Sequence, residues 1–400
     1  MRFGQDPGAI RRKREGRSMM IGRRWIVLVG ATAGAAATMA MATPWLASQA
    51  AGQAGKPARS VVIRTGSLPH VENWADALLV TRVLETTYPY IRIDLIGFPS
   101  GNPVVAGLQS GQLDAAVIVG EQPAINGIAA KAPFKIVTSY GWAQKHHGFV
   151  VRADSPIQRL TDLKGKTVSV QLGTSQHEFA GTVLKEKAGL TLGDLQVVNM
   201  DAPQGAVALK AGKIDAAVLD SSAMQKIIAE GAGRLLQDGT GTKWASTFGS
   251  LLSDRFIKER PVEARRLVEA FRLEQEFQHE HAVLVAELYA QHEKVKLGFD
   301  PALKAITAVP RYPAITDPAT IEVYQRVADF LLEQKQLRER IDIARSGYVD
   351  PSFYMEAEKR LGKFPYERGH EMKVDLSERG RSLDEALRPF IERLKKADPE

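Results

Sequence analysis

The sequence contains no cysteine among its 400 residues. That absence excludes disulfide bonds and a lipid anchored at a cysteine, so the apolar core must stabilise the folded chain. Aromatic residues are few, at 7%. The hydrophobic content of 44% and the charged content of 25% are nevertheless those of an ordinary globular protein.

Signatures of enzymes and of metal sites are also lacking. The sequence has no HExxH, no GxSxG, no P-loop and no GxGxxG after a strand. His146 and His147 are adjacent and would point to opposite sides of a strand, while His279 and His281 stand two apart on a helix and share no face. No nucleophile is placed beside a base. We therefore expect no catalytic residues, no metal and no cofactor.

The positive charge is confined to the beginning of the chain. Residues 1–50 hold eight basic and two acidic residues, which accounts for six of the seven net positive charges. The remainder is almost neutral, although the pI of the whole chain is 9.4. This distribution argues against a basic face for nucleic acid on the folded body.

The first 50 residues have the pattern of an export signal. Arg23 and Arg24 precede an uncharged stretch, "WIVLVGATAGAAATMAMA", and small residues suited to cleavage follow, with Ala50 as the expected site. The stretch is rich in Ala, Gly and Thr, which makes it a poor permanent membrane span. We expect a periplasmic protein exported by the general secretory route, with twin-arginine export as the alternative. Met19 or Met20 is an alternative start.

An internal repeat predicts two α/β lobes. "VAGLQSGQLDAAVIV" (residues 105–119) and "AVALKAGKIDAAVLD" (residues 206–220) match at an offset of 101, which aligns Asp114 with Asp215 and Gly111 with Gly212. Each copy reads as a short helix, a glycine turn, an acid and an apolar strand. Helical stretches separate most of the other apolar runs, and such alternation is typical of mostly parallel sheets covered on both faces.

The strands and turns around the repeat predict the domain boundaries. We expect an outer lobe from residues 60–151 and 248–345, a second lobe at 152–247, and two crossings that form a hinge near Phe149–Val151 and Phe248–Leu251. Helices are predicted to start at Pro261 and at Asp317-Pro318. Residues 346–400 are expected to be a C-terminal helical extension, of which the charge-rich part from residue 362 would be a tail.

In open α/β sheets, ligands bind beyond the carboxyl ends of the strands, where turns meet helix N-termini. The turns selected by this rule are rich in hydroxyl and amide side chains and contain no Arg or Lys. Helix N-termini carry a partial positive charge and can hold an anion, so we expect a singly charged or zwitterionic ligand. The candidate ligand-binding residues are Ser67, His70, Trp74, Ser100, Gly101, Asn102, Glu121, Tyr140, Trp142, Gly173, Thr174, Ser175, His177, Gln204 and Asp220.

Each candidate also has a structural interpretation. Thr174 or Ser175 would serve equally well as a helix cap, a role worth about 1 kcal/mol. Trp74 and Trp142 would serve as core aromatics. His177 would be an exposed histidine in the first turn of a helix.

Four segments resemble a known family. They are "DLKGKTVSVQLGTSQHEFAGTVLKEKAGL", "VALKAGKIDAAVLD", "FIKERPVEARRLVEAF" and "YVDPSFY". Through them the chain from Arg64 to Asp350 resembles the substrate-binding proteins of ABC importers, in the branch that handles aliphatic sulfonates, taurine, nitrate and thiamine-precursor pyrimidines.

The resemblance implies a type II periplasmic-binding-protein fold that closes around a solute and delivers it to a membrane permease with its ATPase subunits. It implies that Thr174, Ser175 and His177 contact the ligand, and that the protein is a monomer that meets the membrane only through the permease. The loop "GSLPHVENW" is bulkier than the family's usual entry and leaves room for an aromatic sulfonate or carboxylate. The alternatives are a binding protein for nitrate or a thiamine-precursor pyrimidine, a periplasmic sensory module, and an enzyme on the same fold.

Overall fold

The structure is a computed structural model that describes residues 60–68, 71–291 and 296–398. The described residues all belong to one compact unit. The proposed export signal lies outside the described residues. No helix in the described ranges has both the length and the apolar character that crossing a bilayer requires.

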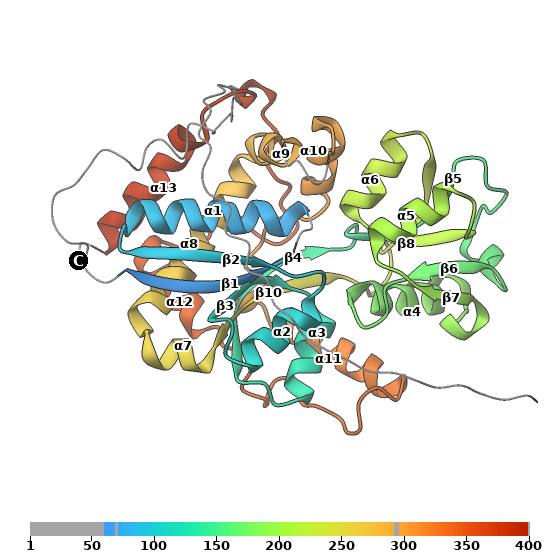
Figure 1. The fold of residues 1–400 in the computed structure, drawn as a ribbon, viewed down its shortest axis with the longest axis horizontal. Coiled ribbons are helices and arrows are strands. Elements are labelled where there is room, and N and C mark those ends of the chain that lie inside the picture. Colours follow the sequence, from blue (N-terminus) through green and yellow to red (C-terminus); the bar gives the residue numbers. More distant parts are fainter. Residues whose placement is uncertain (1–59, 69–70, 292–295, 399–400) are drawn as a thin grey trace, which may run out of the picture. The chain divides into compact units, whose positions relative to one another are not determined.

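Two five-stranded sheets form the framework (Figure 1). The first has the order β2-β1-β3-β10-β4, with β1 (Val61–Ser67), β2 (Ile91–Gly97), β3 (Ala115–Val119), β4 (Phe134–Ala143) and β10 (Ser246–Ser253). The second has the order β7-β6-β8-β5-β9, with β5 (His147–Arg152), β6 (Thr167–Val170), β7 (Gln196–Asn199), β8 (Ala216–Asp220) and β9 (Gly233–Asp238).

The two sheets share one topology. In each, three strands are parallel, and an antiparallel strand, β10 or β5, lies next to the third of them. The antiparallel strand of the first sheet, β10, follows all strands of the second sheet in the sequence. The chain therefore crosses between the two sheets twice. The expected α/β class with two sheets is therefore confirmed.

The repeat has a structural cause. Asp114 accepts a hydrogen bond from the backbone N–H of Arg64 at 3.0 Å and donates its own N–H to the Arg64 carbonyl at 2.8 Å. Asp215 forms the same reciprocal pair with Thr167, at 2.9 Å in both directions. Each acid thus ties the start of a buried strand to the strand beside it, at the end of the sheet away from the carboxyl-end turns.

Helices cover both faces of each sheet, as the strand pattern predicts. On the first sheet α1 lies on one face and α2 and α3 on the other; on the second sheet α4 lies on one face and α5 and α6 on the other (Figure 1). Their bounds are α1 (Val71–Thr87), α2 (Gly101–Gln109), α3 (Glu121–Ala129), α4 (Ser175–Ala188), α5 (Ala202–Lys210) and α6 (Ser221–Ala229).

The chain beyond β10 is helical and packs on the first core. Asp317 caps α11 by accepting from the Ala319 N–H at 2.9 Å, and Pro261 begins α8, both as predicted. These helices are α7 (Asp254–Glu259), α8 (Pro261–Glu280), α9 (Ala282–Ala290), α10 (Phe299–Thr307), α11 (Pro318–Glu333), α12 (Ser352–Leu361) and α13 (Leu383–Ala397).

The expected tail differs from the structure. Leu387, Phe390 and Leu394 of α13 are buried in the same apolar cluster as α1 and α8. Asp398 accepts from Arg266 Nε at 2.6 Å and from the Tyr88 hydroxyl at 3.0 Å. Helical spacing gathers the few apolar residues of this charged segment on one face, which the core covers.

The crossings also differ from the expected hinge positions. Phe149–Val151 and Phe248–Leu251 lie inside β5 and β10, and the chain passes between the sheets at residues 144–146 and 239–245 instead. β5 consequently belongs to the second sheet rather than the first. The two crossing segments are joined by hydrogen bonds from Gly239 N–H to the Gln144 carbonyl at 2.9 Å and from Gln144 Nε2 to the Thr242 carbonyl at 2.9 Å.

Candidate functional site

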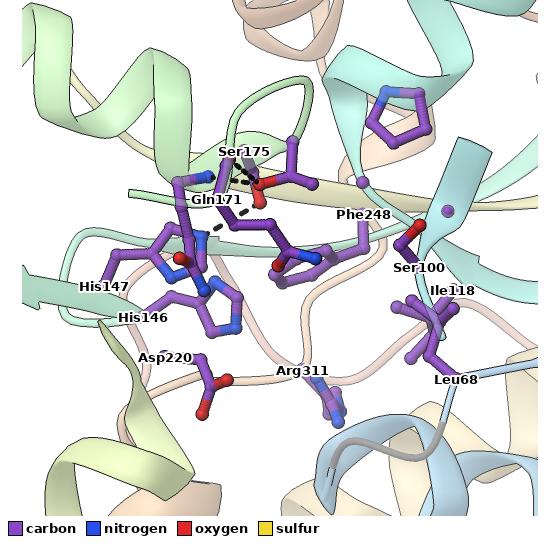
Figure 2. Close-up of a pocket in the computed structure, with 15 residues that line it drawn as sticks. Leu68, Ser100, Ile118, His146, His147, Gln171, Ser175, Asp220, Phe248 and Arg311 are labelled. Carbon is purple, nitrogen blue, oxygen red and sulfur yellow. Dashed lines mark hydrogen bonds between the residues drawn. The ribbon is translucent and has the colours of Figure 1, made fainter. Parts of the chain in front are cut away.

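A cavity of about 70 Å³ lies where the carboxyl-end turns of both sheets meet (Figure 2). One buried water needs roughly 10–15 Å³ on the same measure, so the cavity has room for several waters or a small polar group. From the first sheet and its helices come Leu68, Ser100, Gly101, Ile118, Gly120, Pro123, Phe248 and Arg311. From the crossing and the second sheet come His146, His147, Gln171, Thr174, Ser175, Gln176 and Asp220.

Four helices begin at this cavity. The N-caps of α2 and α3, Ser100 and Gly120, make no side-chain cap hydrogen bond. The N-caps of α4 and α6, Thr174 and Asp220, do cap their helices. Each helix N-terminus carries a partial positive charge of about half an electron. The cavity therefore favours an anionic group, and the first sheet offers it backbone donors that no side-chain cap occupies.

Two adjacent hydroxyls divide the roles of cap and contact. The Thr174 hydroxyl donates to the Gln171 carbonyl at 2.8 Å and accepts from the Gln176 N–H at 3.3 Å, so it holds the turn. The Ser175 hydroxyl lies 2.9 Å from His147 Nε2. If the imidazole donates this bond, the Ser175 proton is available to a ligand. Ser175 is thus the better candidate for ligand contact.

Gly173 precedes these two hydroxyl residues, and its backbone conformation accounts for the glycine at this position. Its φ is +79°, a conformation that side chains disfavour. Its carbonyl accepts from Asn102 Nδ2 at 3.1 Å, which links the turn before α4 to the start of α2. Gly173 and Asn102, both predicted ligand residues, join the two halves of the site without lining the cavity.

His146 and His147 line the cavity together, contrary to the expectation that they point to opposite sides. Their ring centroids are 4.0 Å apart, and His146 also packs edge-on to Phe248 at 4.6 Å. Adjacent side chains point to opposite sides only within a strand, and β5 begins at His147, so His146 belongs to the crossing segment and is not bound by this alternation. Both rings are almost completely buried. The structure also places the Ser175 hydroxyl beside the His147 imidazole, a pairing that the sequence did not indicate.

Asp220 supplies a negative charge at the cavity wall. It is the last residue of β8, it is 5% exposed, and its Oδ1 accepts from the Ala223 N–H at 2.9 Å (Figure 2). A carboxylate at this place disfavours a second negative charge on the ligand nearby and favours an amine. The charge pattern therefore fits a zwitterion.

The structure brings together five of the predicted ligand residues at the cavity, namely Ser100, Gly101, Thr174, Ser175 and Asp220. Sequence reasoning missed the two histidines, Gln171 and Arg311. Gln171 directly follows β6 and was within reach of the strand-end rule. Arg311 carries no such signal, because it lies 58 residues beyond the end of β10 at Ser253.

Glu121 and Tyr140 turn away from the cavity, which corrects their predicted role. The Glu121 carboxylate accepts from the Ser246 hydroxyl at 2.9 Å and from the Thr247 N–H, and burial raises its pKa to about 7. The Tyr140 hydroxyl lies 3.2 Å from Ser250 Oγ, and burial raises its pKa well above the ordinary value. Both side chains tie α3 and β4 to the antiparallel strand β10.

His177 is also displaced from its predicted role. It is 4% exposed, its Nδ1 lies 3.4 Å from Gln122 Nε2, and its ring meets Phe330 edge-on at 5.3 Å. Burial lowers its pKa. His177 follows Gln176 in α4, and consecutive side chains of a helix point in different directions. The His177 side chain therefore packs against α3 and α11 and does not face the cavity.

The remaining candidates do not line the cavity either. Trp74 packs on the first core, Trp142 lies under the Arg368 guanidinium at 5.1 Å, and Gln204 is exposed. The Ser67 carbonyl accepts from the Phe98 N–H at 2.9 Å. His70 lies outside the described residues. Within the described ranges, no three His, Asp or Glu side chains are grouped so as to hold a metal ion.

Comparison with known proteins finds binding proteins of similar sequence and similar fold. An aliphatic sulfonates-binding protein of Bacillus subtilis (strain 168) is 28% identical over 268 residues, 67% of this chain and 79% of that protein. The alkanesulfonate-binding protein SsuA from Xanthomonas axonopodis pv. citri, solved with MOPS bound, superposes with a TM-score of 0.64 at 22% identity. The superposition covers 72% of this chain and 98% of that chain.

The same fold also carries an enzyme. The desulfurization enzyme DSZB superposes with a TM-score of 0.55 at 18% identity, over 75% of this chain and 99% of that chain. At such identities the two structures show the fold alone, which is that of the SsuA-type periplasmic binding proteins and confirms the predicted fold class. The NMT1/THI5-like family matches residues 93–281, which include both copies of the repeat.

Proposed function

We propose that the protein is the solute-binding component of an ABC importer, and that it captures a small sulfonate, anionic or zwitterionic, in the cavity between the two sheets. The observation that carries this proposal is the convergence of four helix N-termini on one cavity, two of them without side-chain caps. The sulfonate-binding relative supports the same ligand class.

The cavity suits a sulfonate for a physical reason. A sulfonate spreads one negative charge over three oxygens, and several backbone and hydroxyl donors can each bind one of them. Ser175 and the first turns of α2 and α3 offer such donors from both sheets. Asp220, which also lines the cavity, would hold an amine. A taurine-like solute satisfies both, and an aromatic sulfonate would extend past Phe248.

Transport follows from closure of the two lobes. A solute bound to one lobe would draw the other toward it, with the crossings at 144–146 and 239–245 as the hinge. Closure can be driven only by the preference of the solute for the closed form. We propose that the closed protein acts in the periplasm as a monomer, after removal of the export signal, and delivers its solute to a permease and its ATPase subunits.

Titration calorimetry with the purified protein tests the proposal. We expect binding of ethanesulfonate and tighter binding of taurine, and weaker binding of nitrate, pyrimidines and neutral amides. Ser175→Ala should weaken sulfonate binding roughly tenfold or more, because a hydrogen bond to a charged group contributes about 1.5–3 kcal/mol. The matched control is His177→Ala, two positions along the same helix but outside the cavity, which should leave the affinity within about twofold.

Two results would reject the proposal. One is that no anion in the panel binds to the wild-type protein. The other is turnover of the bound solute, which would make the Ser175–His147 pair a nucleophile and its base, as in an enzyme.

A further inference from the structure

Arg311 brings a permanent positive charge to the cavity from a part of the chain remote from the strand-end turns. Its segment is held on β4 by a hydrogen bond from the Gly141 N–H to the Tyr312 carbonyl at 2.9 Å and by a bridge between Tyr140 and Pro313. The side chain is 1% exposed and lines the cavity (Figure 2). Among the described residues that line the cavity, Arg311 alone is a lysine or arginine.

The guanidinium of Arg311 is held in one orientation by a closed ring of hydrogen bonds. Its Nη2 donates to both carboxylate oxygens of Asp76 at 3.1 Å, and its Nε donates to Gln278 Oε1 at 3.3 Å. Gln278 Nε2 in turn donates to Asp76 Oδ1. The guanidinium also lies 5.8 Å from the centre of the Tyr140 ring. Three elements, α1, α8 and β4, therefore prevent it from turning.

One carboxylate balances this guanidinium. Glu274 is hydrogen-bonded to the same Gln278 amide, and its pKa is raised well above the ordinary value by burial and by the charge of Asp76. Burial raises the pKa of Asp76 as well, so the site disfavours charge on both neighbouring carboxylates at once, and Arg311 is paired with Asp76.

Stability alone is a weak reason to keep such a pair. Well-packed apolar residues often stabilise a core as well as a buried ion pair does. Here the pair lies at the wall of a cavity. Asp76 and Gln278 occupy the Nη2 and Nε side of the guanidinium fork, so the guanidinium brings chiefly its delocalised positive charge to an oxyanion in the cavity.

We propose that Arg311 is the charged anchor for the anionic group of the solute, and that Asp76 and Gln278 are positioning residues that hold its guanidinium toward the cavity. This inference rests on the proposed function, because it concerns the same cavity. It assigns the recognition of the sulfonate to a residue outside the strand-end turns, and so adds one determinant of specificity to the donors named above.

The test compares a charged probe with a neutral one. Ethanesulfonate and ethanesulfonamide are titrated into the wild-type protein, into Arg311→Gln and into Arg311→Lys. Arg311→Gln should weaken ethanesulfonate binding roughly 10- to 100-fold and change ethanesulfonamide binding by less than about threefold. Arg311→Lys should recover part of the affinity for the sulfonate, since it restores the charge without the fork. A merely structural role would weaken both probes alike.

Arg272→Gln is the matched control. Arg272 is as buried as Arg311 and pairs with Glu276 at 2.5 Å, yet it does not line the cavity. Its replacement should lower the unfolding temperature and leave both affinities unchanged. If Arg311→Gln does not fold, Arg311→Lys and Gln278→Met decide the question, with an expected loss of roughly three- to tenfold for the sulfonate.

The outcomes separate the two proposals. Wild-type binding of ethanesulfonate, with binding within twofold in every folded variant at 311 and 278, would overturn the role of Arg311 and leave the proposed function intact. A wild-type protein that binds no sulfonate or other anion would overturn both.

Discussion

Glu121 offers a quantitative test of the way the site is built. It begins α3 beside the cavity, and its carboxylate is buried against β10, where it accepts from Ser246 and Thr247. Burial raises its pKa from 4.5 to about 7, and the negative charge of Glu178 adds to the effect. Among the described residues, the groups that lower this pKa are hydrogen-bond donors, namely the backbone of Glu121 itself, the Thr247 N–H and the Ser246 hydroxyl.

The sign of the pH dependence follows from this difference. Between pH 4.5 and 7 the folded state holds the Glu121 proton and the unfolded state releases it, so the free energy of unfolding falls as the pH rises through this range. The difference between 4.5 and about 7 corresponds to about 3 kcal/mol, taking 1.36 kcal/mol for each pH unit. This contribution is fully present below pH 4.5 and lost above about 7.

Glu121→Gln removes the titration and keeps an acceptor oxygen for the Thr247 N–H. We expect the variant to be more stable than the wild type by about 2–3 kcal/mol at pH 8 and to differ from it by less than about 1 kcal/mol at pH 5. Urea unfolding at the two pH values, followed by tryptophan fluorescence, measures both differences.

Glu178→Gln is the control. Glu178 is also completely buried but accepts from Arg326 Nε at 3.1 Å, so its replacement removes half of an ion pair and should destabilise the protein at pH 8. Parallel pH profiles for the wild type and Glu121→Gln would refute the reasoning, since they would mean that Glu121 does not bury a charge at pH 8.

Two further predictions concern the framework. Asp114→Asn should lower the free energy of unfolding by about 1–2 kcal/mol at pH 7, because it weakens hydrogen bonds and ion pairs to the partly exposed Arg64 and Arg255. The folded state lowers the pKa of Asp114 from 3.8, so the loss should shrink progressively as the pH falls below 3.8 and through the folded-state pKa. Denaturant unfolding at pH 7 and pH 3 checks both. Gly181→Leu should weaken solute binding roughly tenfold by calorimetry, because a Cβ at this position of α4 would lie 2.6 Å from the Phe330 ring of α11 and keep the lobes apart. An unchanged affinity would count against closure through this contact. The control is Gly193→Ala, where the added Cβ would lie 3.5 Å from its nearest neighbour.

The local pattern of the chain was informative about the framework. The repeat around Asp114 and Asp215 predicted two α/β sheets, since each copy shows a helix, a glycine turn and a strand in consecutive residues. The partners of the two acids, Arg64 and Thr167, lie 50 and 48 residues away and were not part of that pattern. The starts of α8 and α11 were equally readable, because Pro261 and Asp317 act on backbone groups a few positions away. The packing of α13 was less readable, since its apolar stripe is diluted by charged residues.

The candidate site was readable only in part. The strand-end rule selected the turns that hold Ser100, Ser175 and Asp220, because the order of parallel strands brings these turns to one edge of each sheet. It could not tell which side chain of a turn faces the cavity. The side chains of neighbours such as Gln176 and His177 point in different directions. Which of them faces the cavity depends on the elements of the first sheet that pack against α4.

The sequence by itself therefore determined the α/β class, the doubled unit and the turns from which a ligand would be held, because these depend on contacts between residues near one another in the chain. Only the tertiary structure decided that His146, His147 and Arg311 face the same cavity as Ser175. Arg311 and its partner Asp76 are 235 residues apart. No local pattern links residues that meet only when the helices beyond β10 pack back onto the first sheet.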